Sequence, residues 1–590
     1  MDVRYDSSAK KLTLTLIATS IALAGCALDD TKRIISVQQD DEPLPANLLF
    51  TGNRLGVADL NSPADGSIIL GQLMVADASE QLVSIDRRPQ NGQLYALGFN
   101  AVSGSVRLYV VHPVTLKATP LTSAAVAFDS PIGGATPAER AMTRFEIDFN
   151  PQVDRLRVVS SRGENFRMNP NDGTLVGSQQ DKMLSEATNV AGTAYTNTQP
   201  NTSITTQYTV TEGNNSRLFI QNPPNDGDLT QAKDLVPRLN RISGLDIPAG
   251  VNAPASNEGV KSGIAYGLAG TDTQSVARIN LSTGSVVASN PLGNTSGAVG
   301  LATHRPLDTP VIVLASDGTR LIRFEATRPT QIATVSISGV TLGESLVGVD
   351  FRPSTGQLFA LGIDPIANKG TLYRLDPQSG AASTVCPPSP TSCEIFYTVG
   401  GNRVDFPDPA TNDYGFDFNP VVDAIRVTTS TGLNFRVSTA GTALDGDTAA
   451  NGAQPDGNIN GVTMQGAGAA YTNSYEGTAI TTLYIMNSAT DALTIQSSPN
   501  MGTQVAVAPI TVAGNSLNFT AVPGFDIPPE VQTGAANQAV TAGIGYALLT
   551  LGSSTNLYRI NLVNGQAQML GAVPATGLRG LTVGSTGNVR

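Results

Sequence analysis

"FEIDFNPQVDRLRVVSSRGENFRMNP" (residues 145–170) nearly recurs as "YGFDFNPVVDAIRVTTSTGLNFRV" (residues 414–437). Each copy alternates apolar and polar residues, turns at Asn-Pro, and continues into a second alternating stretch that ends in Asn-Phe-Arg. Alternation with period two is typical of β-strands, and Asn-Pro before Asp is typical of a tight turn. The chain is therefore predicted to contain a duplicated β-structure. Its repeated charges belong either to a duplicated ligand site or to the fold itself.

Three further pairs of matching segments keep the same order in the two halves. They are "IDRRPQNGQLYALG" (85–98) with "VDFRPSTGQLFALG" (349–362), "AGTAYTN" (191–197) with "AGAAYTN" (467–473), and "SGLDIP" (243–248) with "PGFDIP" (523–528). This order indicates a tandem duplication. The predicted domains are 48–303 and 309–584, joined by a connector at 304–308 and followed by a tail at 585–590.

Within each half a shorter unit recurs every ~40–60 residues, a period typical of repeat architectures. Residues 346–384 and 542–571 are clear examples, with three or four short strands separated by turn residues. A four-stranded meander at this period is the signature of a β-propeller blade, and each half contains five such units.

The last segment of each half, 298–306 or 577–583, resembles an innermost strand whose remaining strands stand at the start of a half. Closure with strands from both ends would pair edges that are otherwise exposed. We therefore predict an all-β protein of two tandem five-bladed propellers. One ten-bladed ring is the alternative, because "HRPLDT" (304–309) also looks like an ordinary turn between strands.

Composition supports the all-β class and excludes one group of partners. The 590 residues carry a formal charge of −12 and include 59 glycines and 36 prolines, which suit strands and tight turns. An acidic chain without a basic cluster is a poor partner for nucleic acid.

The first residues predict export. Arg4, Lys10 and Lys11 precede the apolar run 12–24, which is short for a membrane span and typical of a signal peptide at 1–25. The run ends in "LAGC", which resembles a lipoprotein cleavage site with lipidation at Cys26. Residues 26–47 are acidic and contain proline, as in a tether. The protein is expected at the cell envelope, anchored by lipid to the membrane. Ala27 after the cysteine favours the outer membrane, at its periplasmic face or at the cell surface.

Cys386 and Cys393 are the other two cysteines and enclose a short Pro/Ser loop. In an exported protein they are expected to form a disulfide. A metal site is the rival interpretation, but no histidine or further cysteine lies nearby in the sequence to complete it.

The segments quoted above, with "AYTN…TTLY", together resemble the bacterial domain of unknown function 4394 family over nearly all of both halves. The first half departs from this pattern where Arg87 replaces the aromatic Phe351 and where "TTQY" replaces "TTLY". The resemblance implies an exported repeat domain and no particular activity.

Polar residues of the innermost strands are the candidate ligand residues. They are Asp86, Asp148 and Asn150, with Asp350, Asp417 and Asn419 in the second half. Carboxylate and amide oxygens suit a hard cation such as Ca²⁺. The structural interpretation is that recurring arginines neutralise these aspartates and that Asn-Pro forms turns.

Two classes of function follow. The first is a non-catalytic binding or scaffolding module without a cofactor, whose propeller faces bind a protein or a glycan. The second is a glycosidase-like hydrolase with a carboxylate pair at the channel. His112 and His304 are the only histidines, and the chain has no tryptophan. A Ser–His triad, a multi-histidine metal site and aromatic sugar platforms are therefore poorly supported, and we expect no enzyme.

Overall fold

The computed structural model describes residues 43–62, 67–177, 179–185, 189–271, 273–292, 297–304, 309–387, 393–446, 452–575 and 577–585. The predicted signal peptide, Cys26, most of the tether and most of the connector lie outside the described residues. The first strand begins at Pro45 and so includes the last residues assigned to the tether. Among the described helices, none combines the length and the apolar character that a membrane crossing requires.

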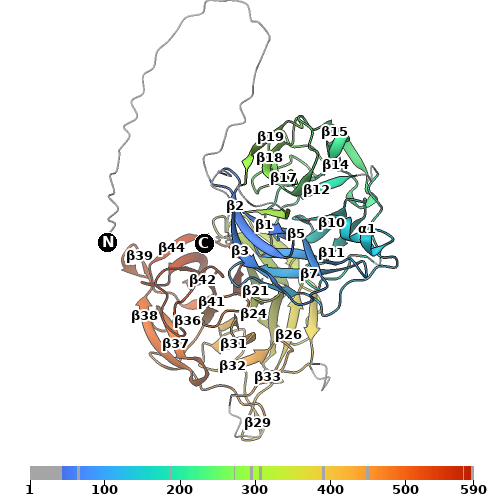
Figure 1. Cartoon of the computed structure of the whole chain (residues 1–590). Helices are drawn as coiled ribbons and strands as arrows, with labels where there is room; N and C mark the ends of the chain where they lie inside the picture. Colours follow the sequence, from blue (N-terminus) through green and yellow to red (C-terminus); the bar gives the residue numbers. More distant parts are fainter. Residues whose placement is uncertain are drawn as a thin grey trace, which may run out of the picture. The chain divides into compact units, whose positions relative to one another are not determined.

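The first half forms five antiparallel sheets (Figure 1, blue to green), one for each blade. The strands of each sheet are given from the innermost outward. One sheet, which closes the ring, consists of β20 (Ala298–Thr303), β1 (Pro45–Phe50), β2 (Arg54–Asp59) and β3 (Ser67–Gln72). The next consists of β5 (Gln81–Arg87), β6 (Leu94–Asn100), β7 (Ser105–His112) and β8 (Lys117–Pro120), with β4 (Met74–Val75) parallel to β8. The third consists of β9 (Phe145–Asn150), β10 (Arg155–Ser160) and β11 (Asn165–Met168). The fourth consists of β12 (Val190–Tyr195), β13 (Gln207–Thr211), β14 (Arg217–Gln221) and β15 (Leu229–Asp234). The fifth consists of β16 (Ile242–Asp246), β17 (Ile264–Ala269), β18 (Ser275–Asn280) and β19 (Val286–Pro291).

The second half repeats this plan (Figure 1, yellow to red). The sheet that closes this ring consists of β45 (Leu578–Val583), β21 (Pro310–Ala315), β22 (Arg320–Glu325) and β23 (Ala333–Ser336). The next consists of β24 (Ser345–Phe351), β25 (Leu358–Asp364), β26 (Lys369–Leu375) and β27 (Ala382–Val385). The third consists of β30 (Tyr414–Asn419), β31 (Ala424–Thr429), β32 (Asn434–Ser438) and β33 (Ala443–Leu444). The fourth consists of β35 (Gly468–Tyr471), β36 (Leu483–Asn487), β37 (Ala492–Ser498) and β38 (Thr503–Pro509), with β34 (Asn460–Gly461) parallel to β38. The fifth consists of β41 (Ala521–Asp526), β42 (Ile544–Leu551), β43 (Ser554–Asn561) and β44 (Ala567–Ala572).

Each half closes into its own ring. In the first half the innermost strands contact one another in the order β5, β9, β12, β16 and β20, and β20 returns to β5. In the second half the order is β24, β30, β35, β41 and β45, and β45 returns to β24. β20 pairs with β1 and β45 pairs with β21, so strands from both ends of a half share one blade, as predicted. The protein is therefore two five-bladed propellers, and the ten-bladed alternative is excluded.

The apolar cores lie between neighbouring blades. One cluster packs Leu97 and Leu108 of one blade against Ile147 and Val158 of the next, and similar clusters recur around both rings. Each cluster of buried apolar residues in the described chain draws its members from one propeller only. Because burial of apolar area is the main favourable contribution to folding, each propeller has its own stabilising core.

Few elements depart from the blade plan. A single helical turn, α1 (Pro137–Met142), is capped at its start by Thr136 and Glu139, which accept hydrogen bonds from each other's backbone N–H groups. Short hairpins form between β28 (Thr398–Val399) and β29 (Asn402–Arg403), and between β39 (Thr511–Val512) and β40 (Asn515–Ser516). In the part of the chain that the structure describes, 3₁₀ turns lie at Gly213–Asn215, Pro224–Asp226 and Pro499–Met501. Cys386 and Cys393, after β27, form a disulfide.

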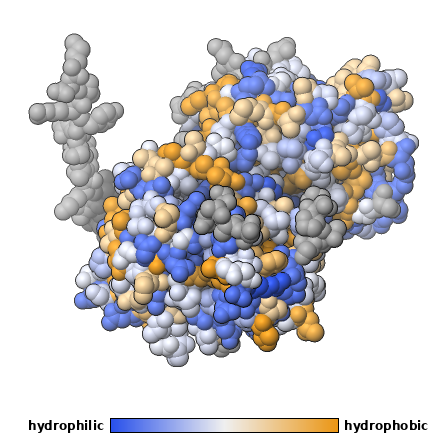
Figure 2. Space-filling model, turned by 90° about the horizontal axis from the view of Figure 1, so that it is seen from below, coloured by the Kyte–Doolittle hydropathy of each residue, from blue (hydrophilic) through white to orange (hydrophobic). Residues whose placement is uncertain are grey.

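On the face shown in Figure 2, hydrophobic residues lie in small groups among hydrophilic ones. Such scattered apolar exposure is ordinary for a protein surface and does not by itself indicate a docking site.

Candidate functional site

Glycines let the innermost strands approach closely around each channel. In the second propeller the same position of all five innermost strands is glycine, at Gly348, Gly415, Gly468, Gly524 and Gly580. A Cβ at Gly348 would lie 2.2 Å from Phe416 Cβ, and a Cβ at Gly524 would lie 2.5 Å from Leu581 Cβ, both on the next blade. The innermost strands of the second propeller therefore leave no room for a side chain at this position. The first propeller has Ser84, Glu146, Gly192, Gly244 and Gly300 at these positions.

Two residues further along these strands, three aspartates of the first propeller join neighbouring blades. Each carboxylate accepts a hydrogen bond from a backbone N–H on the innermost strand of the next blade. The bonds are Asp86 Oδ2 with Phe149 N–H (2.7 Å), Asp148 Oδ1 with Tyr195 N–H (3.1 Å) and Asp246 Oδ2 with Thr303 N–H (2.6 Å). On the other two innermost strands of this propeller, β12 and β20, the equivalent residues are Ala194 and Ala302.

The second propeller repeats the arrangement. Its bonds are Asp350 Oδ2 with Phe418 N–H (2.9 Å), Asp417 Oδ1 with Tyr471 N–H (3.0 Å) and Asp526 Oδ2 with Val583 N–H (2.7 Å). The Thr582 hydroxyl also donates to Asp350 Oδ1 at 2.9 Å. The aspartates therefore first of all hold the ring closed.

The three carboxylates of each propeller also lie close together. In each set, one oxygen atom from each aspartate lies within 4.8 Å of the other two, and all six side chains are buried. Burial raises the pKa of all six carboxyl groups, to about 6 for Asp246 and about 7 for Asp526. Repulsion from a neighbouring aspartate adds to the increase for Asp86, Asp148, Asp350 and Asp417.

Three crowded carboxylates require neutralisation, and protons or a cation can supply it. Oxygen donors at this spacing suit a hard cation such as Ca²⁺, so calcium stays a prediction for these two sets. The sets differ in one neighbour. Arg87 adds its positive charge to the field at Asp86 and Asp246 in the first propeller, whereas Phe351 stands at the equivalent position in the second.

Glu146 adds a fourth carboxyl group to the first channel, where the second propeller has Gly415. Its Oε1 accepts from Gly244 N–H at 3.0 Å, and its Oε2 accepts from the Ser84 hydroxyl at 3.3 Å. Burial raises the pKa of Glu146 to about 8, so the group is mostly protonated at neutral pH. Its side chain thus links three innermost strands, β5, β9 and β16.

The prediction that recurring arginines neutralise Asp86, Asp148 and their copies is wrong. The Arg88 guanidinium forms an ion pair with Asp154 instead, and Arg352 forms the equivalent pair with Asp423. The other recurring pairs are Arg157 and Arg167 with Asp181, and Arg426 and Arg436 with Asp456. Arg88 and Arg352 join the turns of neighbouring blades, and the other four arginines join strands to loops. Among the described residues, none of the six forms an ion pair with a channel aspartate.

Asn150 and Asn419 lie outside the two carboxylate sets. Asn150 Oδ1 accepts from the N–H groups of Gln152 and Val153, and Asn419 Oδ1 accepts from Val421 N–H. Both side chains therefore stabilise the turn after their strand. Of the predicted ligand residues, the structure brings the four aspartates into the channel sets and leaves the two asparagines in turns.

A small cavity of about 20 Å³ lies at the mouth of the second channel. Asp350 and Asp526 line it, together with Asn91 and Gln93 from the first propeller. This is room for one water molecule. The turn between β5 and β6 of the first propeller, which contains Asn91 and Gln93, therefore covers the carboxylates of the second propeller.

A large concave site lies between the propellers. A cleft of about 670 Å³ is lined by β5, β6 and the end of β7 from one propeller and by residues around β41, β42 and β43 from the other. Much of its wall is aliphatic, as at Val114, Pro528 and Ile544. A second cleft of about 550 Å³ shares Ser354 and Glu476 with it. Volumes of this size at a domain boundary are typical of ligand sites.

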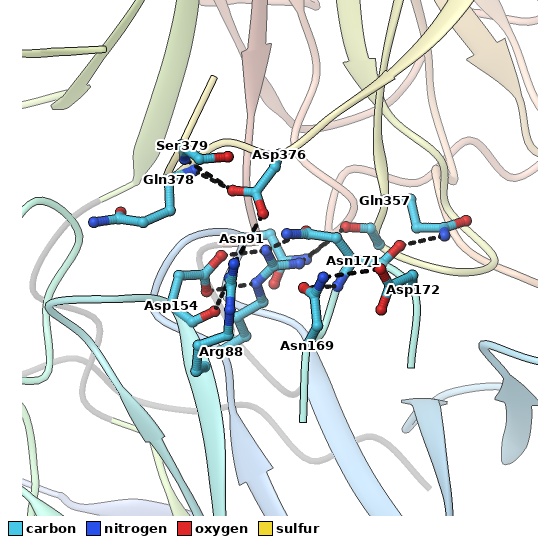
Figure 3. A network of polar contacts seen from close by, with 12 residues as sticks. Arg88, Asn91, Asp154, Asn169, Asn171, Asp172, Gln357, Asp376, Gln378 and Ser379 are labelled. Carbon is cyan, nitrogen blue, oxygen red and sulfur yellow. Dashed lines mark hydrogen bonds and ion pairs between the residues drawn. The ribbon is translucent and has the colours of Figure 1, made fainter. Parts of the chain in front are cut away.

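A polar network holds the two propellers together (Figure 3). Arg88 and Asn91 of the first propeller donate to the carbonyl oxygen of Gly356, and Gln357 Nε2 donates to the carbonyl oxygen of Asn171 at 2.5 Å. Arg155 pairs with Asp376 at 3.2 Å, as another direct contact between the propellers. The turn after β5 thus faces the turn after β24, and the turn after β11 makes a further contact with Gln357.

Asp246, Asp526, the glycines of the innermost strands and the residues of the cleft were not predicted as site residues from the sequence. "SGLDIP" and "PGFDIP" identified Asp246 and Asp526 as repeat markers, and their equivalence to Asp148 was the signal that would have placed them in the channel. The glycine ring would have appeared from an alignment of the five units with one another. The cleft has no local signal, because it depends on how the two propellers meet.

Comparison with known proteins assigns the two halves to one family. The sequence model described as "Domain of unknown function (DUF4394)" matches residues 62–302 and 320–582. No curated protein matches the chain.

Solved structures match the chain at low identity. The Kuenenia stuttgartiensis hydrazine synthase structure is 11% identical, covers 83% of this chain and 98% of its own, and has a TM-score of 0.22. The Dos1 propeller is 9% identical, with 57% and 80% coverage and a TM-score of 0.23. TolB from Acinetobacter baumannii is 11% identical, with 57% and 62% coverage and a TM-score of 0.25. The closed strand order, rather than these matches, establishes the propeller fold here.

Proposed function

The chain belongs to the DUF4394 family, with two copies in tandem, and from this premise we propose that it is a non-catalytic binding or scaffolding module of the cell envelope. In this proposal lipid on Cys26 anchors the protein to the outer membrane, at its periplasmic face or at the cell surface. The two propellers are displayed beyond the tether and bind a ligand at their shared cleft.

The cleft of about 670 Å³ is the observation that carries the proposal. It combines an apolar wall with a few polar groups, which is the usual composition of a binding site at a domain boundary. Both propellers contribute to it, so the duplication itself creates the site. A single copy would lack one wall.

A glycosidase-like hydrolase at the channel has less support. A general acid and a nucleophile must reach the substrate, whereas Asp86, Asp148 and Asp246 are buried and already accept N–H groups of the next blade. The polar contacts of these carboxylates favour a structural role.

The anchor is tested by fractionation of the full-length protein and its Cys26→Ser variant. We expect the native protein in the membrane fraction and the variant either released or left unprocessed. An equal membrane share and identical processing of the two proteins would refute the lipid anchor.

A further inference from the structure

We propose that the cleft between the propellers binds an amphipathic anion, with an apolar body against the aliphatic wall and an acidic group at Arg559. This inference deepens the proposed binding function and rests on it.

The wall of the cleft suits an apolar body. Val114 is 56% exposed at its edge, and Pro113, Pro528, Pro529 and Ile544 line its sides. Proline and branched aliphatic side chains offer no hydrogen bonds and lose little conformational freedom on contact with a ligand. A chain or ring system of hydrocarbon therefore gains most from this surface.

Most charged groups in the cleft are already engaged. Arg87 donates to the Gly92 carbonyl and to Asn47 Oδ1 at 2.8 and 2.7 Å. Glu476 forms an ion pair with Lys117, and Glu530 accepts a hydrogen bond from the Ser585 hydroxyl. Burial lowers the pKa of His112 to about 4, so this side chain is neutral at physiological pH.

Arg559 on β43 is the exception. Its side chain is exposed, lines the cleft, and has no hydrogen-bond or ion-pair partner among the described residues. A guanidinium in this position offers several N–H donors to a carboxylate, phosphate or sulfate group. The available charge in the cleft is therefore positive, although the whole chain is acidic.

The duplication supplies an internal comparison. Arg278 occupies the position of Arg559 in the first propeller, opposite Tyr266 as Arg559 lies opposite Tyr546. Arg278 donates to the Leu60 carbonyl at 3.2 Å and to Asn61 Oδ1 at 3.1 Å, so its charge serves the fold. The equivalent Arg559 of the second propeller has no such partners among the described residues and lines the cleft.

Three probes with the same hydrocarbon chain test the charge requirement: decanoate, 1-decanol and decyltrimethylammonium. We expect the full-length protein to bind decanoate best by calorimetry. Arg559→Gln should weaken decanoate binding by about tenfold, the usual effect of losing a charged hydrogen bond, and leave 1-decanol unchanged. Arg278→Gln is the matched control and should alter neither affinity.

Two results would overturn the inference. Equal binding of decanoate and 1-decanol, unchanged by Arg559→Gln, would remove the anion requirement while the binding function stands. Decanoate binding that survives Val114→Glu would place the site outside the cleft. A different result would refute the proposed binding function itself: catalytic turnover of a substrate that is lost when a channel aspartate is replaced.

Discussion

Glu146→Gln isolates the energetic effect of a buried carboxyl group in the first channel. The pKa of Glu146 is about 8 in the folded protein, because of burial, whereas that of an exposed glutamate side chain is 4.5. The folded protein therefore binds a proton that the unfolded chain releases. The stability that this group contributes is fully present below pH 4.5 and is lost as the pH rises to about 8.

The two pKa values set the size of the effect. Their difference corresponds to at most about 5 kcal/mol in the free energy of unfolding between acid and alkaline conditions. Glutamine has the same shape and no charge. Its amide oxygen can accept from Gly244 N–H, and its amide nitrogen can donate to the Ser84 hydroxyl. We expect wild type and variant to be equally stable at about pH 4, and the variant to be more stable by several kcal/mol above pH 8.

Urea unfolding followed by circular dichroism measures this difference, since the chain has no tryptophan for fluorescence. The exposed Glu258 provides the matched control, and Glu258→Gln should leave the pH profile unchanged. The second propeller has Gly415 in place of Glu146, so its transition should not shift. A stability difference between Glu146→Gln and wild type that is the same at every pH would refute the reasoning.

Three further outcomes follow from the channels and the two closed rings. Asp417→Ala should destabilise the second propeller by about 1–3 kcal/mol under acidic conditions, where the channel carboxyl groups are protonated and Tyr471 N–H loses its acceptor; an unchanged urea midpoint would show that this bond contributes nothing. Residues 43–304 and 309–590, expressed separately, should each unfold cooperatively, because every core cluster belongs to one propeller; fragments that fold only when mixed would contradict two independent rings. The protein should show no turnover on a panel of glycans and esters, and any turnover abolished by Asp148→Asn would instead support the hydrolase.

The sequence predicted the architecture because its signals are local and repeated. Alternation, turn residues and the final segments at 298–306 and 577–583 identify blades and their closure without knowledge of side-chain contacts. Each half supplied an independent copy of the same pattern. This is why the number of blades could be counted before the strands were paired.

Contacts between distant residues could not be predicted in the same way. Arg88 lies two residues after Asp86 in the chain, yet its partner is Asp154 on the next blade. Asp246 joins Asp86 and Asp148 only because the ring closes with a particular register. The cleft depends on contacts such as Gln357 with Asn171, and these residues have no distinctive pattern in the sequence.

Native mass spectrometry of the full-length protein purified from its native cells tests the cleft most directly. We expect a bound acidic, amphipathic molecule that is retained by Asp148→Asn, a change in the channel, and lost from Val114→Glu, a change at the cleft wall. Retention by Val114→Glu together with loss from Asp148→Asn would place the functional site in the channel and contradict the account.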